Sequence, residues 1–403
     1  MKTNKYILIQ FLFITTLLSA QVDIEISDDM LLETTGDLVI KVSGDVVESG
    51  NGYLNGVVTS GVRGAIAQFA GLTLSSPLNG KITRTTGKMY PGTGENLTRY
   101  YEVDSQEDSD LIVNVTTVST TAEHGSLTGP FFHYTRNGSN WKGCGYGSLG
   151  TTIVSNDVLF PQNSITNLII SEGVSVKVKI FLEGPYNTVY HNMNNYINNI
   201  IPLTSPYSAD VRTASNKPST SVDWGLVQLR DQTSPSTVVA SRSAFLNSDG
   251  NLIDDNATSG ISIAAPAGDY YIAIKHRNHL AVMSANKVTL PNTTSYDFTT
   301  SDTSYFGSNG AKLLETNPSN VWGMIAGDAN ADGTVKYNGA RNDRFPILTR
   351  LGNVQSATLN GYFVEDVNMN GQVKYNGPNN DRVIILNNLD NIQSSTKDTQ
   401  VPN

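Results

Sequence analysis

The chain has 403 residues, and its 27 Lys and Arg against 36 Asp and Glu give a formal net charge of −9. An acidic chain with so few cationic side chains binds polyanions poorly, which excludes nucleic acid as an expected partner. The single cysteine, Cys144, cannot form an internal disulfide, so stability has to come from apolar burial or from bound metal. The length exceeds what one hydrophobic core usually holds, and we expect about two to four domains.

The N-terminus has the pattern of a secretory signal peptide over residues 1–20. Lys2 and Lys5 precede an apolar stretch, and small residues follow near Ala20. No later apolar run approaches the roughly 20 residues that a membrane-spanning helix needs. We therefore predict a secreted protein, extracellular or at the cell surface with the periplasm as an alternative, and no membrane span in the mature chain.

Short alternating runs punctuated by Asn-Gly pairs, such as Asn51-Gly52 and Asn55-Gly56, predict strands after residue 37. Their spacing suits either the rungs of a β-solenoid or a meander, and the sequence does not decide between a solenoid and a sandwich. We expect a β-rich, repeat-like region over residues 21–95 and a second β-rich domain over residues 96–172. In the second domain, Asn137-Gly138 between two aromatic runs predicts a hairpin turn.

The strongest strand pattern lies in residues 174–182, where apolar residues alternate with polar ones. Similar short runs separated by turn residues continue to residue 298 and predict an antiparallel β-sandwich over residues 173–298. Helix is scarce there, and a brief helical turn is expected only within residues 188–201. The polar residues 299–320 are predicted to form a linker.

Near its end the chain repeats itself. Residues 327–344, GDANADGTVKYNGARNDR, and residues 365–382, EDVNMNGQVKYNGPNNDR, agree at 11 of 18 positions without a gap. The offset from Asp328 to Asp366 is 38 residues, which indicates an internal repeat. An apolar helix is predicted after each copy, in DRFPILTRLG and DRVIILNNLD.

Each copy opens with the pattern of a calcium-binding loop. Asp328, Asn330 and Asp332 occupy alternate positions and Gly333 follows, as in D-x-[DN]-x-[DN]-G. Calcium is a hard cation that takes six to eight oxygens, alternate side chains in a tight turn converge on it, and glycine supplies the backbone angle that closes the turn. We therefore expect calcium to be bound by both copies.

The last ligand is displaced in both copies. Position twelve, where an ordinary loop of this kind has an acidic residue, holds Gly339 and Gly377, and the next carboxylates are Asp343 and Asp381 at position sixteen. We infer an insertion of four residues that bulges outward and returns each aspartate to the metal. Residues 328–343 are called loop one below, and residues 366–381 loop two. The predicted metal ligands are Asp328, Asn330, Asp332, Thr334 and Asp343 in loop one, and Asp366, Asn368, Asn370, Gln372 and Asp381 in loop two. Loop one offers three carboxylates and loop two offers two, which predicts weaker binding by loop two.

A doubled calcium loop and helix without a leading helix resembles the dockerin domain, over residues 321–392, with a tail at 393–403. The resemblance implies two units about a pseudo-twofold axis, folding on calcium, and a cohesin-like protein as partner. It also implies cohesin contacts by Tyr337 with Asn338 and by Tyr375 with Asn376. The alternative is that both tyrosines pack on their own loops.

Residues 174–390 also resemble exported Bacteroidetes proteins labelled hemagglutinin, through stretches such as VDWGLVQLRD and GDYYIAIKHRNHLAVMSA. That resemblance implies secretion or surface display more than any reaction.

Other candidates have weaker signals. His276 and His279 have metal-like spacing but sit at a strand end. The acidic residues Asp104, Glu107, Asp108 and Asp110 suit a cation or a solvated loop. The aromatic residues Tyr134, Trp141 and Tyr146 suit a sugar-stacking platform or a half-buried core.

The sequence thus predicts a mainly β chain with an N-terminal solenoid or sandwich region, a β-sandwich, and a small C-terminal α-helical calcium module. The favoured function is a secreted, non-catalytic adhesin or surface or matrix protein, with glycan as a further expected ligand. The alternative is an accessory or catalytic component of an extracellular polysaccharide-degrading complex. No catalytic residue and no cofactor besides calcium is predicted.

Overall fold

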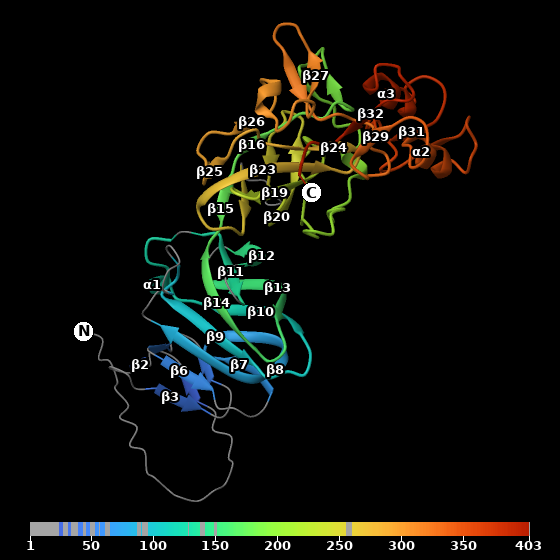
Figure 1. Ribbon diagram of the computed structural model, residues 1–403. Coiled ribbons are helices and arrows are strands. Elements are labelled where there is room, and N and C mark those ends of the chain that lie inside the picture. The colour runs from blue at the N-terminus through green and yellow to red at the C-terminus, as the bar shows by residue number, and fades with distance from the viewer. Residues whose placement is uncertain are drawn as a thin grey trace, which may run out of the picture. The chain divides into compact units, whose positions relative to one another are not determined.

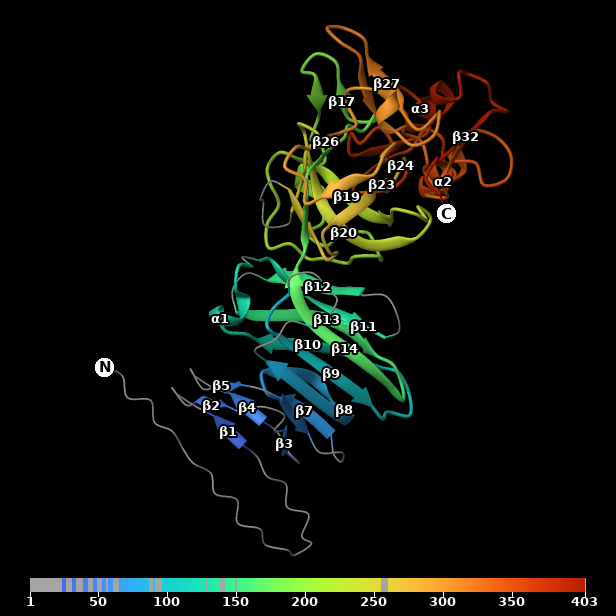
Figure 2. The same cartoon turned by 60° about the vertical axis from the view of Figure 1, so that its left-hand side comes forward.

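The computed structural model describes residues 57–60, 65–86, 90, 96–127, 129–137, 142–148, 151–254 and 260–402, together with five short strands between residues 24 and 55. Its strands and few helices are labelled in Figure 1, and Figure 2 shows the same chain turned by 60°. Of the described residues 46% are strand and 8% helix, so the prediction of a mainly β chain is confirmed. The predicted signal peptide lies outside the described residues.

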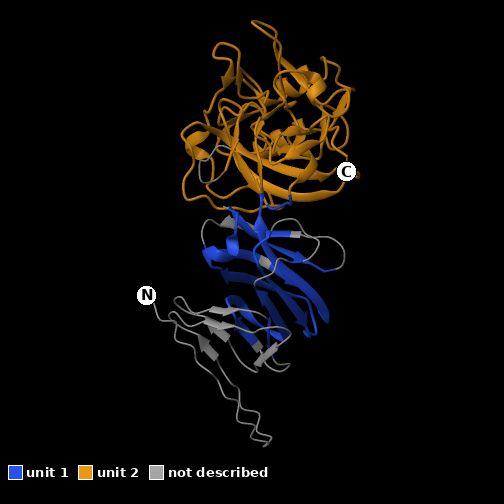
Figure 3. Ribbon diagram, turned by 90° about the vertical axis from the view of Figure 1, so that its left-hand side faces the viewer, with its two compact units in different colours: residues 1–173, 264–266 blue, residues 174–263, 267–403 orange. Residues whose placement is uncertain are grey.

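The chain divides into two compact units (Figure 3). Unit 1 comprises residues 1–173 and 264–266, and unit 2 comprises residues 174–263 and 267–403. Each is described by itself below.

Unit 1 begins with short strands, and each of the first four pairs in parallel with the strand three places later in the chain. These strands are β1 (Ile24–Ile26), β2 (Leu31–Glu33), β3 (Val39–Val42), β4 (Val46–Glu48), β5 (Tyr53–Asn55), β6 (Val57–Ser60) and β7 (Ala65–Phe69). β1 pairs with β4, β2 with β5, β3 with β6 and β4 with β7, all in parallel. A solenoid with three strands in each coil would have this pairing, and the solenoid itself stays a prediction.

The rest of unit 1 is antiparallel. It contains β8 (Leu72–Thr86), β9 (Arg99–Ser105), β10 (Leu111–Val118), α1 (Thr121–His124), β11 (Phe131–Arg136), β12 (Lys142–Ser148), β13 (Thr152–Phe160) and β14 (Ser164–Glu172). β8 pairs with β6 and β7 on one side of the predicted boundary at residue 95 and with β9 and β10 on the other. The two predicted N-terminal regions therefore share one twelve-stranded, nearly closed, barrel-like sheet. β11 and β12 form the hairpin that Asn137-Gly138 predicts, although its tip lies outside the described residues.

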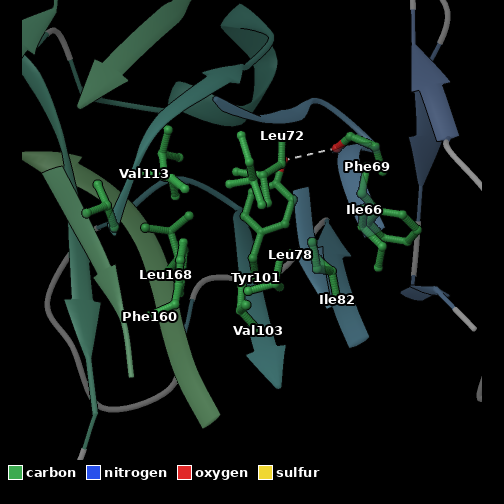
Figure 4. Packing of buried hydrophobic residues seen from close by; sticks show 14 of the residues in the cluster. Ile66, Phe69, Leu72, Leu78, Ile82, Tyr101, Val103, Val113, Phe160 and Leu168 are labelled. Atoms are coloured by element: carbon green, nitrogen blue, oxygen red, sulfur yellow. Dashed lines mark hydrogen bonds between the residues drawn. The ribbon is translucent and has the colours of Figure 1, made fainter. Parts of the chain in front are cut away.

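Aromatic and aliphatic side chains fill the interior of this sheet. Figure 4 shows Tyr101 of β9 among Leu72, Val113 and Leu168, all of them buried. The Tyr101 hydroxyl donates to the Ala70 carbonyl at 3.0 Å, so its polar end is satisfied inside the core.

Unit 2 is built around one six-stranded antiparallel sheet of order β21-β20-β19-β23-β24, with β25 also on β23. Its strands are β19 (Ser221–Asp231), β20 (Val238–Asn247), β21 (Leu252–Ile253), β23 (Gly268–His276), β24 (His279–Met283) and β25 (Val288–Leu290). The other strands of unit 2 form two-stranded pairs, so the sandwich stays a prediction. They are β15 (Val174–Val176), β16 (Val178–Lys179), β17 (Tyr186–Asn187), β18 (Asn192–Met193), β22 (Ile261–Ile263), β26 (Tyr296–Asp297), β27 (Lys312–Glu315), β28 (Val321–Gly323), β29 (Thr334–Lys336), β30 (Thr358–Asn360), β31 (Gln372–Lys374) and β32 (Thr396–Asp398).

Helix in unit 2 is limited to η1 (Asn198–Ile200), η2 (Asp302–Ser304), α2 (Arg344–Arg350) and α3 (Asp381–Asn388) among the described residues. α2 and α3 stand where the two apolar helices are predicted, and η1 lies within the predicted brief turn. The stretch predicted as a linker, 299–320, contains η2 and β27, and β27 pairs with β28. It is an integral part of unit 2.

The two copies of the repeat exchange strands. β29, which follows the turn of loop one, pairs with β32 at the end of the second copy, and β31 of loop two pairs with β30 at the end of the first copy. Side chains follow the same rule: Asn338 donates to Gln393 at 2.9 Å and Asn376 donates to Gln355 at 3.1 Å. The shared core also has equivalent members, namely Val335 and Val373, Tyr337 and Tyr375, Ile347 and Ile385, and Leu351 and Leu389.

Residues 393–403, predicted as a tail, complete this arrangement. They carry β32, and Thr399 N donates to the carbonyl of Gly333 in loop one at 2.8 Å. Val401 is buried with Ala273 and Met283 of the six-stranded sheet. Sequence patterns do not predict this role because β32 has only three residues, all of them polar or charged.

Removing residues 393–403 should destabilise unit 2 by about 2–4 kcal/mol, because a strand pair and a buried valine are lost together. Calorimetric unfolding of the truncated chain should show a lower transition temperature for unit 2 and an unchanged one for unit 1. A truncated chain that unfolds as the full chain does would contradict the integral role of β32.

Candidate metal centre

Loop one is a tight turn organised by its own acidic and amide side chains. Asp328 accepts the backbone N–H of Asp332 on Oδ1 at 3.0 Å and that of Gly333 on Oδ2 at 2.9 Å. Asn330 Oδ1 accepts the same Asp332 N–H at 2.9 Å, so the side chains of Asp328 and Asn330 meet at one amide. Gly333 has φ +84°, the left-handed conformation that the predicted closing glycine supplies.

Asp343 lies inside this turn, although fifteen positions separate it from Asp328. Its Oδ2 accepts the Lys336 N–H at 2.6 Å, while its own N–H donates to the Lys336 carbonyl at 2.9 Å. Its Oδ1 accepts the Ala329 N–H at 2.9 Å. The segment between residues 336 and 343 is therefore closed at its base and bulges outward, which places the carboxylate beside the start of the loop.

Loop two has the same geometry. Asp366 accepts the N–H groups of Asn370 at 3.1 Å and Gly371 at 2.8 Å. Asp381 accepts those of Val367 at 2.9 Å and Lys374 at 2.8 Å. Because the two loops differ in sequence at several positions yet keep the same contacts of both carboxylates, these contacts belong to the repeat.

Four buried carboxylates result, two in each loop. Burial raises the pKa of Asp343 and Asp381 to about 8 and that of Asp328 and Asp366 to about 6. Backbone N–H groups act in the opposite direction on all four, and the charge of Arg277 also lowers the pKa of Asp366. Within the described part of the chain, none of the four forms an ion pair with Lys, Arg or His. An ionised carboxylate has about four lone-pair sites, and the N–H bonds leave some of them free to meet a cation.

The other predicted ligands are arranged less uniformly. Asp332 Oδ1 accepts the Thr334 N–H at 3.0 Å, and Asn370 Oδ1 accepts the Gln372 N–H at 2.9 Å. The Thr334 hydroxyl donates to Asp398 at 2.8 Å, so this side chain turns toward β32. Gln372 likewise turns toward Asn360 on β30, and only the main chain of these two residues is left for a metal.

The side-chain oxygens of Asn330 and Asn368 accept hydrogen bonds inside their turns, and their side-chain nitrogens donate to the bulging segment of the same loop. Asn330 Nδ2 donates to the Arg341 carbonyl at 2.8 Å, and Asn368 Nδ2 donates to the Asn379 carbonyl at 2.9 Å. No three His, Cys, Asp or Glu side chains gather into a metal-binding group among the described residues. A cation here would therefore draw on amide and carbonyl oxygens as well, a donor set that suits calcium.

The two tyrosines that the dockerin resemblance assigns to a partner are buried. Tyr337 and Tyr375 are each 6% exposed and belong to the core of the repeat. Arg344 lies over the ring of Tyr337 at 4.6 Å, and Arg382 lies over that of Tyr375 at 4.7 Å. The structure thus matches the alternative interpretation, that these tyrosines pack on their own loops.

A feature that sequence patterns do not reveal ties both loops to the six-stranded sheet. It is the turn Arg277-Asn278 between β23 and β24. Asn278 Nδ2 donates to the carbonyls of Val364 at 3.0 Å and Asp366 at 2.8 Å, and the Asn278 carbonyl accepts the Gly327 N–H at 3.1 Å. One buried asparagine therefore contacts the first residue of loop two and the residue just before loop one.

His276 and His279 join a chain of hydrogen bonds behind this turn. Gly184 N donates to His279 Nε2 at 3.1 Å, which leaves the His279 proton on Nδ1. This nitrogen lies 2.8 Å from Asn278 Oδ1 and 3.0 Å from His276 Nδ1. His276 Nε2 then donates to Asp223 Oδ2 at 3.1 Å. Burial lowers the pKa of both histidines, so both are neutral and this chain is consistent throughout. Their spacing serves the interior of unit 2, as the strand-end interpretation expects.

Asp223 is the anchor of this interior chain. Arg277 Nε donates to it at 2.6 Å and the Tyr362 hydroxyl at 2.6 Å, and Arg277 also donates to the Phe363 carbonyl. Burial alone would raise the pKa of Asp223, but Arg277, His276 and Tyr362 together hold that pKa well below its usual range. The segment leading into loop two is thereby fixed to β19 and β23.

The acidic and aromatic residues that were weaker site candidates have structural roles where the structure describes them. Glu107 accepts the Asn79 N–H at 2.7 Å and Asp110 accepts the Gln162 N–H at 3.0 Å, so these two acidic residues brace turns. Tyr134 is buried and donates to the Glu172 carbonyl at 2.9 Å. Trp141 and the side chain of Tyr146 lie outside the described residues.

Gly184 packs directly on loop two, which gives a sharp test of this contact. A Cβ at Gly184 would lie 2.4 Å from the Val367 carbonyl oxygen. Gly184→Ala should therefore destabilise unit 2 by about 1–3 kcal/mol, measured by chemical denaturation. Gly268→Ala is the matched control, because its Cβ would meet only the Tyr270 ring at 3.7 Å or more. Equal stabilities for the two variants would contradict the close packing of loop two on residue 184.

No protein-family model matches this chain, and neither do curated protein sequences or solved structures. None of the helices in the described ranges combines the length and the apolar character that crossing a bilayer requires.

Proposed function

We propose that each loop of the C-terminal repeat binds one calcium ion, and that the two ions hold unit 2 of an exported, non-catalytic adhesin or matrix protein in its folded form. The observation that carries this proposal is the presence of two buried carboxylates in each of two equivalent loops, none of which forms an ion pair with a Lys, Arg or His among the described residues. Burying such charges is costly unless a cation compensates them.

The donor chemistry favours calcium over other metals. Carboxylate, amide and carbonyl oxygens are hard ligands, and no His or Cys of the described chain is among them. Asp328, Asn330, Asp332 and Asp343 would hold the ion in loop one, and Asp366, Asn368, Asn370 and Asp381 in loop two. When bound, calcium would compensate the buried charge and fix the turn. The signal-peptide pattern supports export into compartments where loops of modest affinity can fill.

An assembly role with a cohesin-like partner stays a prediction from the dockerin resemblance. The burial of Tyr337 and Tyr375 removes them from such a contact. The contacts of Asn278 with both loops favour a role inside unit 2, since these loops are fixed to the sheet rather than carried on a flexible tether.

Calcium titration of the full chain without its signal peptide, after treatment with a chelator, tests the proposal. Calorimetry should show two binding sites, and at a free concentration 100-fold above Kd each site should add about 2.7 kcal/mol to the free energy of unfolding. Magnesium should add less, because it demands octahedral geometry and loses water reluctantly. An unfolding temperature that does not change with calcium would overturn the proposal.

The two sites should differ in affinity by charge. Loop one has Asp332 where loop two has Asn370, so loop one should bind calcium more tightly. Asp332→Asn should weaken the tighter site and Asn370→Asp should strengthen the weaker one, each by about tenfold or 1.4 kcal/mol. Calcium titration of both variants checks this prediction. Two wild-type sites of equal affinity would refute it, and so would tighter binding by Asp332→Asn or weaker binding by Asn370→Asp.

The displaced aspartate should be essential in each loop. Asp343→Asn keeps the shape of the side chain but removes its charge, and should weaken calcium binding by loop one by at least about tenfold. Asp381→Asn should do the same in loop two. Asp390→Asn is the control, since it makes the same change at an exposed residue outside both loops. Unaltered calcium binding by Asp343→Asn and Asp381→Asn would show that the inserted bulge does not return a ligand.

A further inference from the structure

A long stretch of unit 2 carries no charged side chain. From Gly184 to Ala209 there are 26 residues without Asp, Glu, Lys or Arg, whereas 16% of the whole chain is charged. Glu183 and Asp210 flank it. We refer to residues 184–209 as the neutral segment. Its composition is dominated by asparagine, tyrosine and aliphatic residues.

The neutral segment is held in place by side-chain amides, although little of it is strand or helix. Asn187 Oδ1 accepts the Val189 N–H at 2.8 Å, and its Nδ2 donates to Asn194 at 3.1 Å. Asn198 Nδ2 donates to the carbonyls of Pro218 at 3.0 Å and Ser221 at 2.9 Å. These bonds fix the backbone without using regular secondary structure.

A second support comes from β27. Tyr186 donates to Glu315 at 2.7 Å, and His191 Nδ1 lies 2.9 Å from the other oxygen of Glu315. The hairpin β17–β18 is thereby fixed beside the pair β27–β28, as Figure 2 shows. The tip of this hairpin, residues 188–191, is exposed.

Two tyrosines project from this rigid support. Tyr190 is 70% exposed and Tyr196 is 67% exposed. Among the large hydrophobic side chains of the described residues, Phe345 is the other aromatic residue exposed to this degree, whereas Tyr101, Tyr305 and most others are buried. Tyr190 and Tyr196 are six residues apart, so their Cα atoms lie within about 20 Å of each other.

We propose that the neutral segment is a binding surface for a neutral glycan chain, on which Tyr190 and Tyr196 stack. Aromatic rings match the apolar C–H faces of sugars, and tyrosine offers this area at a low cost in side-chain entropy. Exposed amides such as Asn195 and Asn199 can bond sugar hydroxyls. The absence of charge over the segment fits an uncharged ligand and gives nothing to attract a polyanion. A pre-formed support keeps the ordering cost of binding low.

This inference rests on the proposed role of the protein as an adhesin, and names the surface and the ligand class. The test is affinity electrophoresis of the full chain without its signal peptide, in 1 mM calcium (roughly the extracellular range). The gels contain soluble neutral polysaccharides, namely mixed-linkage β-glucan, xyloglucan, galactomannan or arabinoxylan. Polygalacturonate serves as the anionic comparison. We expect at least one neutral polymer to retard the wild-type protein, and polygalacturonate not to do so.

Tyr190→Ala with Tyr196→Ala should weaken that retardation at least tenfold, while the double exchange to Phe should preserve most of it because stacking needs only the ring. Phe345→Ala is the matched control, since it removes an aromatic ring that is 64% exposed but lies on α2, outside the neutral segment, and it should have no effect. Circular dichroism and calcium titration should be unchanged in all three variants.

Three results would overturn the surface: no retardation by any neutral polymer, retardation by polygalacturonate alone, or equal retardation of the wild type and the double alanine variant. A wild-type chain that still binds two calcium ions in those cases leaves the proposed calcium role standing. Conversely, retardation that depends on both tyrosines in a chain without calcium binding would support the surface and refute the calcium proposal.

Discussion

The constraint on which unit 2 depends is the burial of carboxylates that form no ion pair with a cationic side chain of the described residues. Asp343 and Asp381 are fully buried, and each is surrounded by backbone N–H groups of its own loop. Those N–H groups orient the carboxylates but do not cancel their charge, which is why burial still raises the pKa of both. The same arrangement occurs twice, with matching contacts 38 residues apart, and the two cations that we propose would compensate the buried charge in both loops.

The exchange of strands between the copies makes the two loops depend on each other. β29 needs β32, which follows loop two, and β31 needs β30, which follows loop one. The strand that follows each loop therefore completes a strand pair of the other, and the two proposed sites would be coupled through the main chain. Asn278 adds a second coupling, because it contacts Asp366 and Gly327 from the tip of the β23–β24 hairpin. Asp223 on β19 bonds to Arg277, the neighbour of Asn278, and to Tyr362, and so connects the segment before loop two to the six-stranded sheet.

Local sequence patterns predicted the features that depend on neighbouring residues, but not the pairings and contacts that join segments distant in the sequence. The repeat, the position of Asp343 beside Asp328 and the helices after each loop follow from spacing alone, and the inward alternation of residues 174–182 matches their burial. β30 and β32 escape notice because three residues carry no periodicity, and their partners lie in the other copy. The N-terminal strands show why pattern alone leaves topology open: alternation marks a strand, but parallel pairing with the third strand along depends on where the chain returns. Asn278 gives no signal, since its partners come 86 and 88 positions later.

The neutral segment and loop two meet in space, which links the two proposals. Gly184, the first residue of the neutral segment, packs against the Val367 carbonyl, and a Cβ on Gly371 would lie 3.8 Å from Ile197 and 3.9 Å from Ile200. The turn η1 therefore rests on the glycine that closes loop two. A cation that fixes this loop would also help to fix the support from which Tyr196 projects, together with the asparagine bonds and contacts such as that of the Met193 N–H with the Ser248 carbonyl at 2.9 Å. Calcium in loop two would then act on glycan binding through position alone, without touching the ligand, and loop one would contribute only through the strands that the two copies exchange.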